Sequence, residues 1–127
     1  MRQELFLKNK ISRQIKQNGS HFVFNRFDID EYGQKTDEIV ETFSFDGLFH
    51  ETISHVHVQL SETDAARIVD VPSSYVLCLF EDGKQIALDD FVEINKNIYR
   101  VINKINVGNF NVAYDIMLRM EANGSDT

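Results

Sequence analysis

Residues 90–106 read DFVEINKNIYRVINKIN, and this stretch decides the fold class of the chain. Apolar and polar side chains alternate on both sides of Asn95, Lys96 and Asn97, as they do in strands that bury one face. Asparagine tolerates the left-handed backbone of a tight turn better than most residues do. The stretch therefore predicts a β-hairpin with strands at 90–94 and 98–106.

The strand pattern continues in both directions from this hairpin. Upstream, YVLCLF at 75–80 is apolar on both faces, which is typical of a central strand. The main irregular segment, SETDAARIVDVPSS at 61–74, predicts a long loop of the kind that carries function in a compact domain. Further strands are predicted at 21–27, 36–45, 53–60 and 111–120.

The first residues follow a different period. In RQELFLKNKISRQIKQ, residues 2–17, the apolar residues Leu7, Ile11 and Ile15 recur every four positions and form one helical stripe. Asn18 and Gly19 supply a helix stop, because both residues tolerate the left-handed conformation there. The sequence therefore predicts an N-terminal helix.

Together these elements predict a mainly β fold: a small antiparallel β-barrel of six to seven strands with an N-terminal α-helix. The 127 residues suit a single domain, with the helix at 2–17, the barrel at 21–120 and a frayed tail at 121–127. Hydrophobic residues make up 43% of the chain, which is ordinary for a domain with one core.

The charge is unevenly spread. The net charge is −7, yet residues 1–20 hold five basic side chains and one acidic one. The acidic remainder argues against sequence-specific nucleic-acid binding, because phosphates repel it. The basic helix fits either a solvated face or a head-to-tail contact with the acidic body of another copy.

The sequence also bears on the compartment. Residues 1–10 lack the apolar core of a signal peptide, and the longest apolar run, at about 75–80, is too short for a bilayer. The single cysteine, Cys78, cannot form an internal disulfide, and its apolar neighbours predict a buried, inert thiol. We therefore expect a cytosolic protein without a membrane partner.

The acidic segment FDIDEYGQKTDE, residues 27–38, resembles the start of a calcium loop. Counted from Asp28, however, the fifth and twelfth positions hold Tyr32 and Ile39, where a calcium loop needs oxygen ligands. Gly33 instead favours a hairpin turn, because it can adopt positive φ. The segment therefore predicts an acidic connection between two strands.

Three histidines are the remaining metal candidates. His55 and His57 lie on one face of a predicted strand, and His50 is a third candidate ligand. Strand alternation explains the pair equally well. No nucleophile elbow, Cys–His motif or phosphate-binding glycine loop is present in the sequence. We expect no catalytic residues and no cofactor; a metal-dependent enzyme that uses the histidines is the weakest alternative.

Several segments in order carry a family resemblance. After the basic helix come FDIDEYGQ, FDGLFHE and VPSSYVLCLFEDGKQIALDDFVEINKNIYRVINKINVGN, then a terminal strand. Over roughly residues 4–121 the chain resembles the small head–tail connector proteins of long-tailed bacteriophages and prophage-like elements, closest to the head-completion or stopper type. Related proteins often have glycine where this chain has Asp89. The most telling pattern lies within 79–101 and is carried by Asp90, Val92, Ile94, Asn95, Tyr99 and Val101.

The resemblance implies a non-enzymatic structural role. Such proteins form a homo-oligomeric ring below the portal after DNA packaging, close the channel and present a surface to the tail. The expected partners are portal or adaptor proteins above and tail proteins below, and the isolated chain can be a monomer. The expected locations are the bacterial cytoplasm during assembly and then the head–tail interface of the virion.

The resemblance also assigns roles to two segments. In the stopper type, a loop that projects from the barrel acts as the plug. The length of 61–74 places the plug there, with Glu62, Thr63, Asp64 and Arg67, and the segment 46–52 is the second candidate. The N-terminal helix is expected to contact a neighbouring subunit through Lys8, Ile11, Arg13 and Ile15. The rival hypothesis is a small β-barrel that binds a protein or small molecule and has no phage role.

Overall fold

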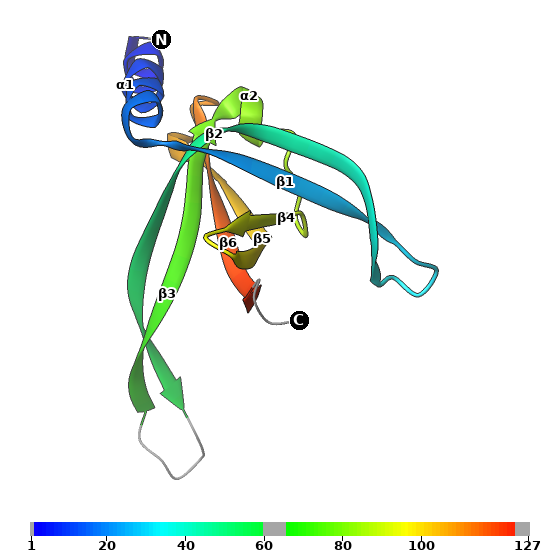
Figure 1. Ribbon diagram of the computed structural model, residues 1–127. Helices are drawn as coiled ribbons and strands as arrows, with labels where there is room; N and C mark the ends of the chain where they lie inside the picture. Colours follow the sequence, from blue (N-terminus) through cyan, green and yellow to red (C-terminus); the bar gives the residue numbers. More distant parts are fainter. Residues whose placement is uncertain (1, 60–65, 124–127) are drawn as a thin grey trace.

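The structure is a computed structural model that describes residues 2–59 and 66–123, with the backbone alone at residue 2 and at 53–59, 66–72 and 122–123 (Figure 1). It is mainly β with an N-terminal helix, as predicted. The elements are α1 (Arg2–Asn18), β1 (Ser20–Ile29), β2 (Lys35–Gln59), β3 (Ala66–Leu79), α2 (Phe80–Gly83), β4 (Phe91–Ile94), β5 (Asn97–Asn106), a 3-10 turn η1 (Val107–Asn109) and β6 (Ala113–Asn123).

Six antiparallel strands close into a barrel in the order β1-β2-β3-β6-β5-β4. The closing contact is short, because β1 and β4 pair at two positions only: Phe24 pairs with Val92, and Asn25 pairs with Phe91. The predicted barrel is therefore confirmed with six strands. β6 continues to Asn123, into the predicted tail.

Inward-facing residues of all six strands fill the barrel. Phe24 is fully buried and stacks on Phe45 with ring centroids 5.3 Å apart. Burying such a side chain stabilises the fold by about 2–3 kcal/mol. The other buried members of this core are Phe22, Val76, Cys78, Ile86, Val92, Ile94, Tyr99, Val101, Ile116 and Leu118.

Helix α1 packs on the barrel through its predicted apolar stripe. Ile11 and Ile15 are each 7% exposed and form a second cluster with Val112 and Ala113. The helix ends where the backbone N–H of Gly19 donates to the carbonyl of Ile15 at 2.8 Å. This confirms the predicted helix and its glycine stop.

The structure corrects the prediction of separate strands at 36–45 and 53–60. Both belong to β2, a continuous strand of 25 residues. Its first half pairs with β1 as far as Gly47, and its second half pairs with β3 from Leu48 onward. A Cβ atom on Gly47 would lie 2.8 Å from Cγ1 of Val76, so the glycine allows the strand to pass close to β3.

The long loop predicted at 61–74 is also corrected, because β3 begins at Ala66. Proline usually interrupts a strand, yet Pro72 lies in register opposite Ile53 of β2. Proline is tolerated where a strand has a free edge, and β6 pairs with β3 only from Ser74 onward.

Both predicted tight turns are present. Asn95 and Lys96 have φ of 52° and 69°, and the flanking residues Ile94 and Asn97 pair across the hairpin. In the β1–β2 turn, Gly33 has φ of 79°, and the Asp30 carboxylate accepts hydrogen bonds from the backbone N–H groups of Tyr32 and Gln34. Residues 30–34 therefore form the turn between β1 and β2, as expected, and the other acids of 27–38 lie on the two strands that it joins.

Candidate functional site

The outer part of the β2–β3 hairpin extends away from the barrel (Figure 1). β3 pairs with β6 only over 74–79, whereas its pairing with β2 continues outward to Ala66, opposite Gln59. Residues 52–59 and 66–73, named here the ribbon, therefore pair only with each other among the described strands. At about 3.3 Å per residue the ribbon is roughly 25 Å long. A two-stranded ribbon is marginally stable in water, so its free edges favour a partner.

One of the four predicted plug residues, Arg67, lies in the ribbon. Arg67 lies in β3, in register with Val58 of β2, and its side chain is not described. Glu62, Thr63 and Asp64 lie outside the described residues. The role of these four residues stays a prediction.

A second hairpin, formed by the end of β1 and the start of β2, leaves the barrel in another direction (Figure 1). Its residues 27–41, named here the acidic hairpin, carry six acidic side chains and one basic one, Lys35. Among the described residues, Asp28, Glu31, Asp37 and Glu38 form no ion pair. The hairpin therefore presents uncompensated negative charge.

Arg26 fastens the base of the acidic hairpin to the loop that precedes β4. Its Nε and Nη2 atoms donate to Asp90 Oδ1 and Oδ2 at 2.9 and 3.0 Å, and Nη2 also donates to the Gln85 carbonyl at 3.0 Å. Asp90 is 1% exposed and accepts a third hydrogen bond from the Ala87 N–H at 2.8 Å. The hydrogen bond to Asp90 raises the pKa of Arg26. All of these contacts tie segments of the fold together, so we assign Asp90 a structural role.

The neighbouring Asp89 has φ of 73°, the left-handed conformation that glycine adopts most readily. Its carboxylate accepts a hydrogen bond from Arg100 Nη1 at 3.0 Å. Asp89 and Asp90 therefore form a turn directly before β4.

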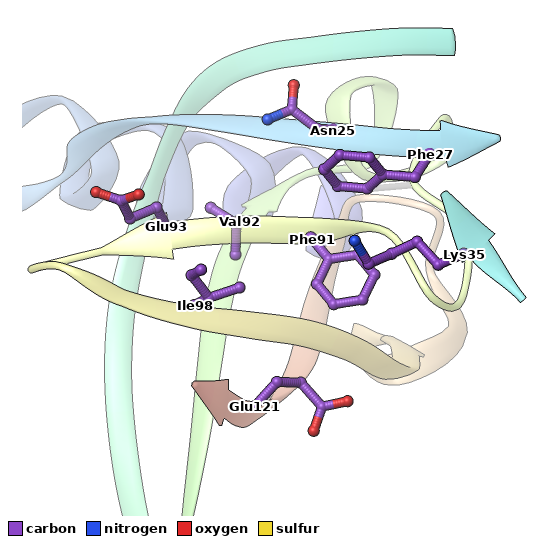
Figure 2. Close-up of a pocket in the computed structure, with 8 residues that line it drawn as sticks. All are labelled: Asn25, Phe27, Lys35, Phe91, Val92, Glu93, Ile98 and Glu121. Atoms are coloured by element: carbon purple, nitrogen blue, oxygen red, sulfur yellow. The ribbon is translucent and has the colours of Figure 1, made fainter. Parts of the chain in front are cut away.

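A pocket of about 340 Å³ opens beside the closing contact of β1 and β4 (Figure 2). The rings of Phe27 and Phe91 meet edge to face with centroids 5.6 Å apart. Lys35 reaches back from β2, and its Nζ lies 4.1 Å from the Phe27 centroid and 5.2 Å from that of Phe91. Stacking a cation on aromatic faces contributes about 0.5–1 kcal/mol at an exposed site.

The remaining pocket residues are Asn25, Val92, Glu93, Ile98 and Glu121. The two glutamates and the aromatic wall suit a cationic or apolar group, and Lys35 already occupies the aromatic side.

The structure divides the predicted contact residues of α1 into two groups. Ile11 and Ile15 are buried against the chain's own barrel, which occupies them within the chain. Lys8 and Arg13 are exposed. Lys8 lies beside Leu79 and Phe80, whereas Arg13 lines a groove on the outer face of the helix.

His50 lies apart from His55 and His57, the two other histidines considered as metal candidates. His50 Nε2 lies 2.9 Å from Asp115 Oδ1, and its ring stacks on Tyr75 at 5.1 Å. His55 follows five residues later in the same strand, about 16 Å along an extended backbone, which is too far to share an ion. The side chains of His55 and His57 are not described. Within the described residues, no three potential metal ligands cluster.

Two further charged or reactive groups support the barrel. Burial raises the pKa of the Cys78 thiol to about 12, which keeps it protonated. Lys104 Nζ donates to the carbonyls of Gly83 and Ile86 at 2.9 and 2.7 Å and lies 4.5 Å from the centroid of Tyr114. Burial lowers the pKa of Lys104. Lys104 therefore fixes the start of the loop between α2 and β4, and Asp90 fixes the end of the same loop.

Sequence reasoning missed Arg26, Lys35 and Lys104. One signal was available for the first: an arginine stands in the aromatic strand HFVFNRF, where its charge demands a partner. Its partner Asp90 is distant in the chain, so no local pattern identifies the pair.

No protein-family model matches this chain, and a search of curated proteins finds no match. Among the described helices, none is long and apolar enough to cross a membrane.

Proposed function

We propose that this protein is a structural component of the head–tail connector of a long-tailed bacteriophage or prophage-like element, of the head-completion type. It forms a ring below the portal, closes the DNA channel and joins the tail. It acts without catalysis, first in the bacterial cytoplasm and then in the virion.

The ribbon is the observation that carries the proposal. It leaves the barrel by about 25 Å with backbone edges that pair with nothing else in the described chain. In a ring, ribbons from successive copies converge, and strand edges that are marginal alone gain neighbours. Such a convergence blocks a central channel without needing a separate domain.

The charge distribution supports the same role. The chain has a net charge of −7, and the acidic hairpin concentrates part of it on one projection. Negative surfaces repel the phosphate backbone, so DNA passes such a ring without adhering to it.

The proposal is tested by deleting the gene from a phage or inducible prophage that carries it. We expect full heads that lose their DNA and bear no tails, seen by electron microscopy and nuclease sensitivity. Particles of normal appearance and infectivity would refute the role, as would a metabolic gene neighbourhood in place of portal and tail genes.

A second candidate function is a binding module, which the pocket beside Phe27 and Phe91 favours. Its apolar wall and two glutamates suit a partner with a cationic side chain. Replacing Phe91 with alanine would then abolish partner binding, while in a connector the same change would affect only the acidic hairpin.

A further inference from the structure

The outer face of α1 carries an unusual combination of exposed groups. Phe6 is 71% exposed, and Lys10 and Arg13 follow it at i+4 and i+7, so the three share one face. They line a shallow groove of about 350 Å³ together with Asn9 and Gln14. A helix docks into an apolar groove through anchor side chains spaced along one face, and aromatic and arginine side chains are frequent among the residues that dominate such contacts.

A groove of that kind lies at the base of the acidic hairpin. It has a volume of about 490 Å³, and Ile29, Val40 and Leu88 line it while remaining 55%, 50% and 58% exposed. We name it the hairpin groove. Exposed aliphatic side chains gathered around one hollow mark an interaction surface.

The charges at the hairpin groove suit a cationic partner. Asp28 lines it without an ion pair among the described residues, and the acidic hairpin around it carries six acidic side chains. Asp89 also lines it, but its charge is matched by Arg100. Arg26 also lines it, but its charge is matched by Asp90 and Glu41. The one lysine of the hairpin, Lys35, is stacked on Phe27 and Phe91 in the neighbouring pocket.

A single chain cannot bring the two surfaces together. β1 starts directly after α1, and the acidic hairpin lies at its other end, ten residues further along an extended strand. At about 3.3 Å per residue this separates them by roughly 30 Å. Figure 1 shows α1 and the β1–β2 turn at opposite sides of the molecule.

We propose that the Phe6–Lys10–Arg13 face of α1 docks into the hairpin groove of a second copy of this chain. Phe6 enters among Ile29, Val40 and Leu88, and Arg13 approaches Asp28. The contact joins two different surfaces, so a pair of copies keeps one free groove on the first copy and one free helix on the second. Repetition of such a contact builds a ring or an open chain. The inference deepens the proposed function and rests on its ring.

The contact is tested with two exposed charge reversals, Arg13→Glu and Asp28→Arg, in the full chain. Self-association is measured by analytical ultracentrifugation at low ionic strength, where surface charges are least screened. We expect the wild-type mass to rise with concentration, and each reversal to weaken association by roughly tenfold, because it turns an attraction into a repulsion.

The decisive sample is an equimolar mixture of the two variants. Every contact in an alternating assembly is then complementary. The glutamate introduced on the helix of one variant meets the arginine introduced in the groove of the other, and the unchanged Arg13 meets the unchanged Asp28. We expect the mixture to regain wild-type association. A mixture that associates no more strongly than either variant alone, or a wild-type chain that stays monomeric, overturns the proposal.

Two further variants serve as controls for this experiment. Lys8→Glu makes the same charge change on the same helix, but Lys8 lies beside Leu79 and Phe80, so association is expected to be unchanged. Phe6→Ser removes the anchor without a charge change and is expected to weaken association. If Lys8→Glu weakens association as much as Arg13→Glu does, net charge explains the effect and the contact is wrong.

This experiment and the gene deletion fail separately. Recovery in the mixture with normal particles from the deletion would retain the contact and reject the phage role. Defective particles without recovery in the mixture would retain the role and reject this contact.

Discussion

The two hairpins that leave the barrel differ in how they are held. The acidic hairpin is fastened at its base by Arg26 and Asp90, and Lys35 stacks back on Phe27 and Phe91. The backbone of the ribbon, by contrast, pairs only within the ribbon itself as far as residues 2–59 and 66–123 show. One strand, β2, contributes to both hairpins: its residues up to Gly47 pair with β1, and its residues from Leu48 onward pair with β3.

The largest loss of stability is expected for Asp90→Ala, which unfastens the acidic hairpin. The change leaves Arg26 and the Ala87 N–H without their buried acceptor, at a cost of about 3 kcal/mol in the free energy of unfolding. Urea denaturation measures the loss. The matched control is Asp89→Gly, which relieves a positive φ and gives up an exposed ion pair, so its net effect is expected within about 0.5 kcal/mol. Equal losses in the two variants would show that the fastening is not specific to Asp90.

A slightly smaller loss is expected for Gly19→Ala, at the junction of α1 and β1. A Cβ atom there would lie 2.4 Å from the Ile15 carbonyl oxygen and 2.5 Å from that of Gly47. Both are backbone atoms, so the helix must shift, at a cost of about 2–3 kcal/mol.

The control for this variant is Gly33→Ala in the acidic hairpin. An added Cβ meets nothing within 4 Å there, and only the positive φ opposes it, at about 1 kcal/mol. A Gly33 variant that is the less stable of the two would contradict the close packing at Gly19.

The pH dependence of the free energy of unfolding tests whether the barrel encloses Cys78. Its thiol has a pKa of about 12 in the folded protein, against an ordinary value of 9.0, because of burial. The stability that this proton provides is complete below pH 9.0 and is lost as the pH rises toward 12, at about 1.4 kcal/mol per unit. Denaturation series between pH 8 and about 10 are expected to show the decline in the wild type but not in Cys78→Ala.

The difference in unfolding free energy between the wild type and Cys78→Ala at each pH isolates the contribution of the thiol. Lys104, whose pKa burial lowers, acts in the opposite direction, and it is present in both. Parallel profiles would show that Cys78 is not enclosed by the barrel.

Removal of the ribbon is expected to have the smallest effect on stability and the largest effect on function. Thr52 and Ser73 pair across β2 and β3, so Asn-Gly can replace residues 53–72 as a two-residue turn. The ribbon pairs only with itself in the described chain, and its removal is expected to change the free energy of unfolding by less than about 1 kcal/mol. Cooperative unfolding of a much less stable protein would show that the ribbon belongs to the core.

Local patterns in the sequence predict the elements whose signals are local. The helix stripe of Leu7, Ile11 and Ile15 and the turns at Gly33 and Asn95 all match the structure. Each depends on the periodicity or the backbone preference of a few neighbouring residues. The mainly β class follows from the same signals.

What the sequence could not predict depends on contacts between distant segments. FDGLFHET, residues 45–52, looks like a break between strands in the sequence. Gly47 is needed there because the strand passes close to Val76, and this contact is not visible in the local sequence. Pro72 looks like a breaker until the free edge of β3 is known. The pairing of Arg26 with Asp90 and the hairpin groove arise only when β1, β2 and the loop before β4 meet.

The central claim, that the ribbon closes a channel, is tested most directly in particles. A phage or prophage would carry the variant in which Asn-Gly replaces residues 53–72, with a folded barrel verified in the purified protein. The measurement is the fraction of packaged DNA that nuclease destroys in particles assembled with this variant. We expect full heads that leak their DNA even though the barrel is incorporated. Particles that incorporate the variant and retain their DNA as the wild type does would contradict the account.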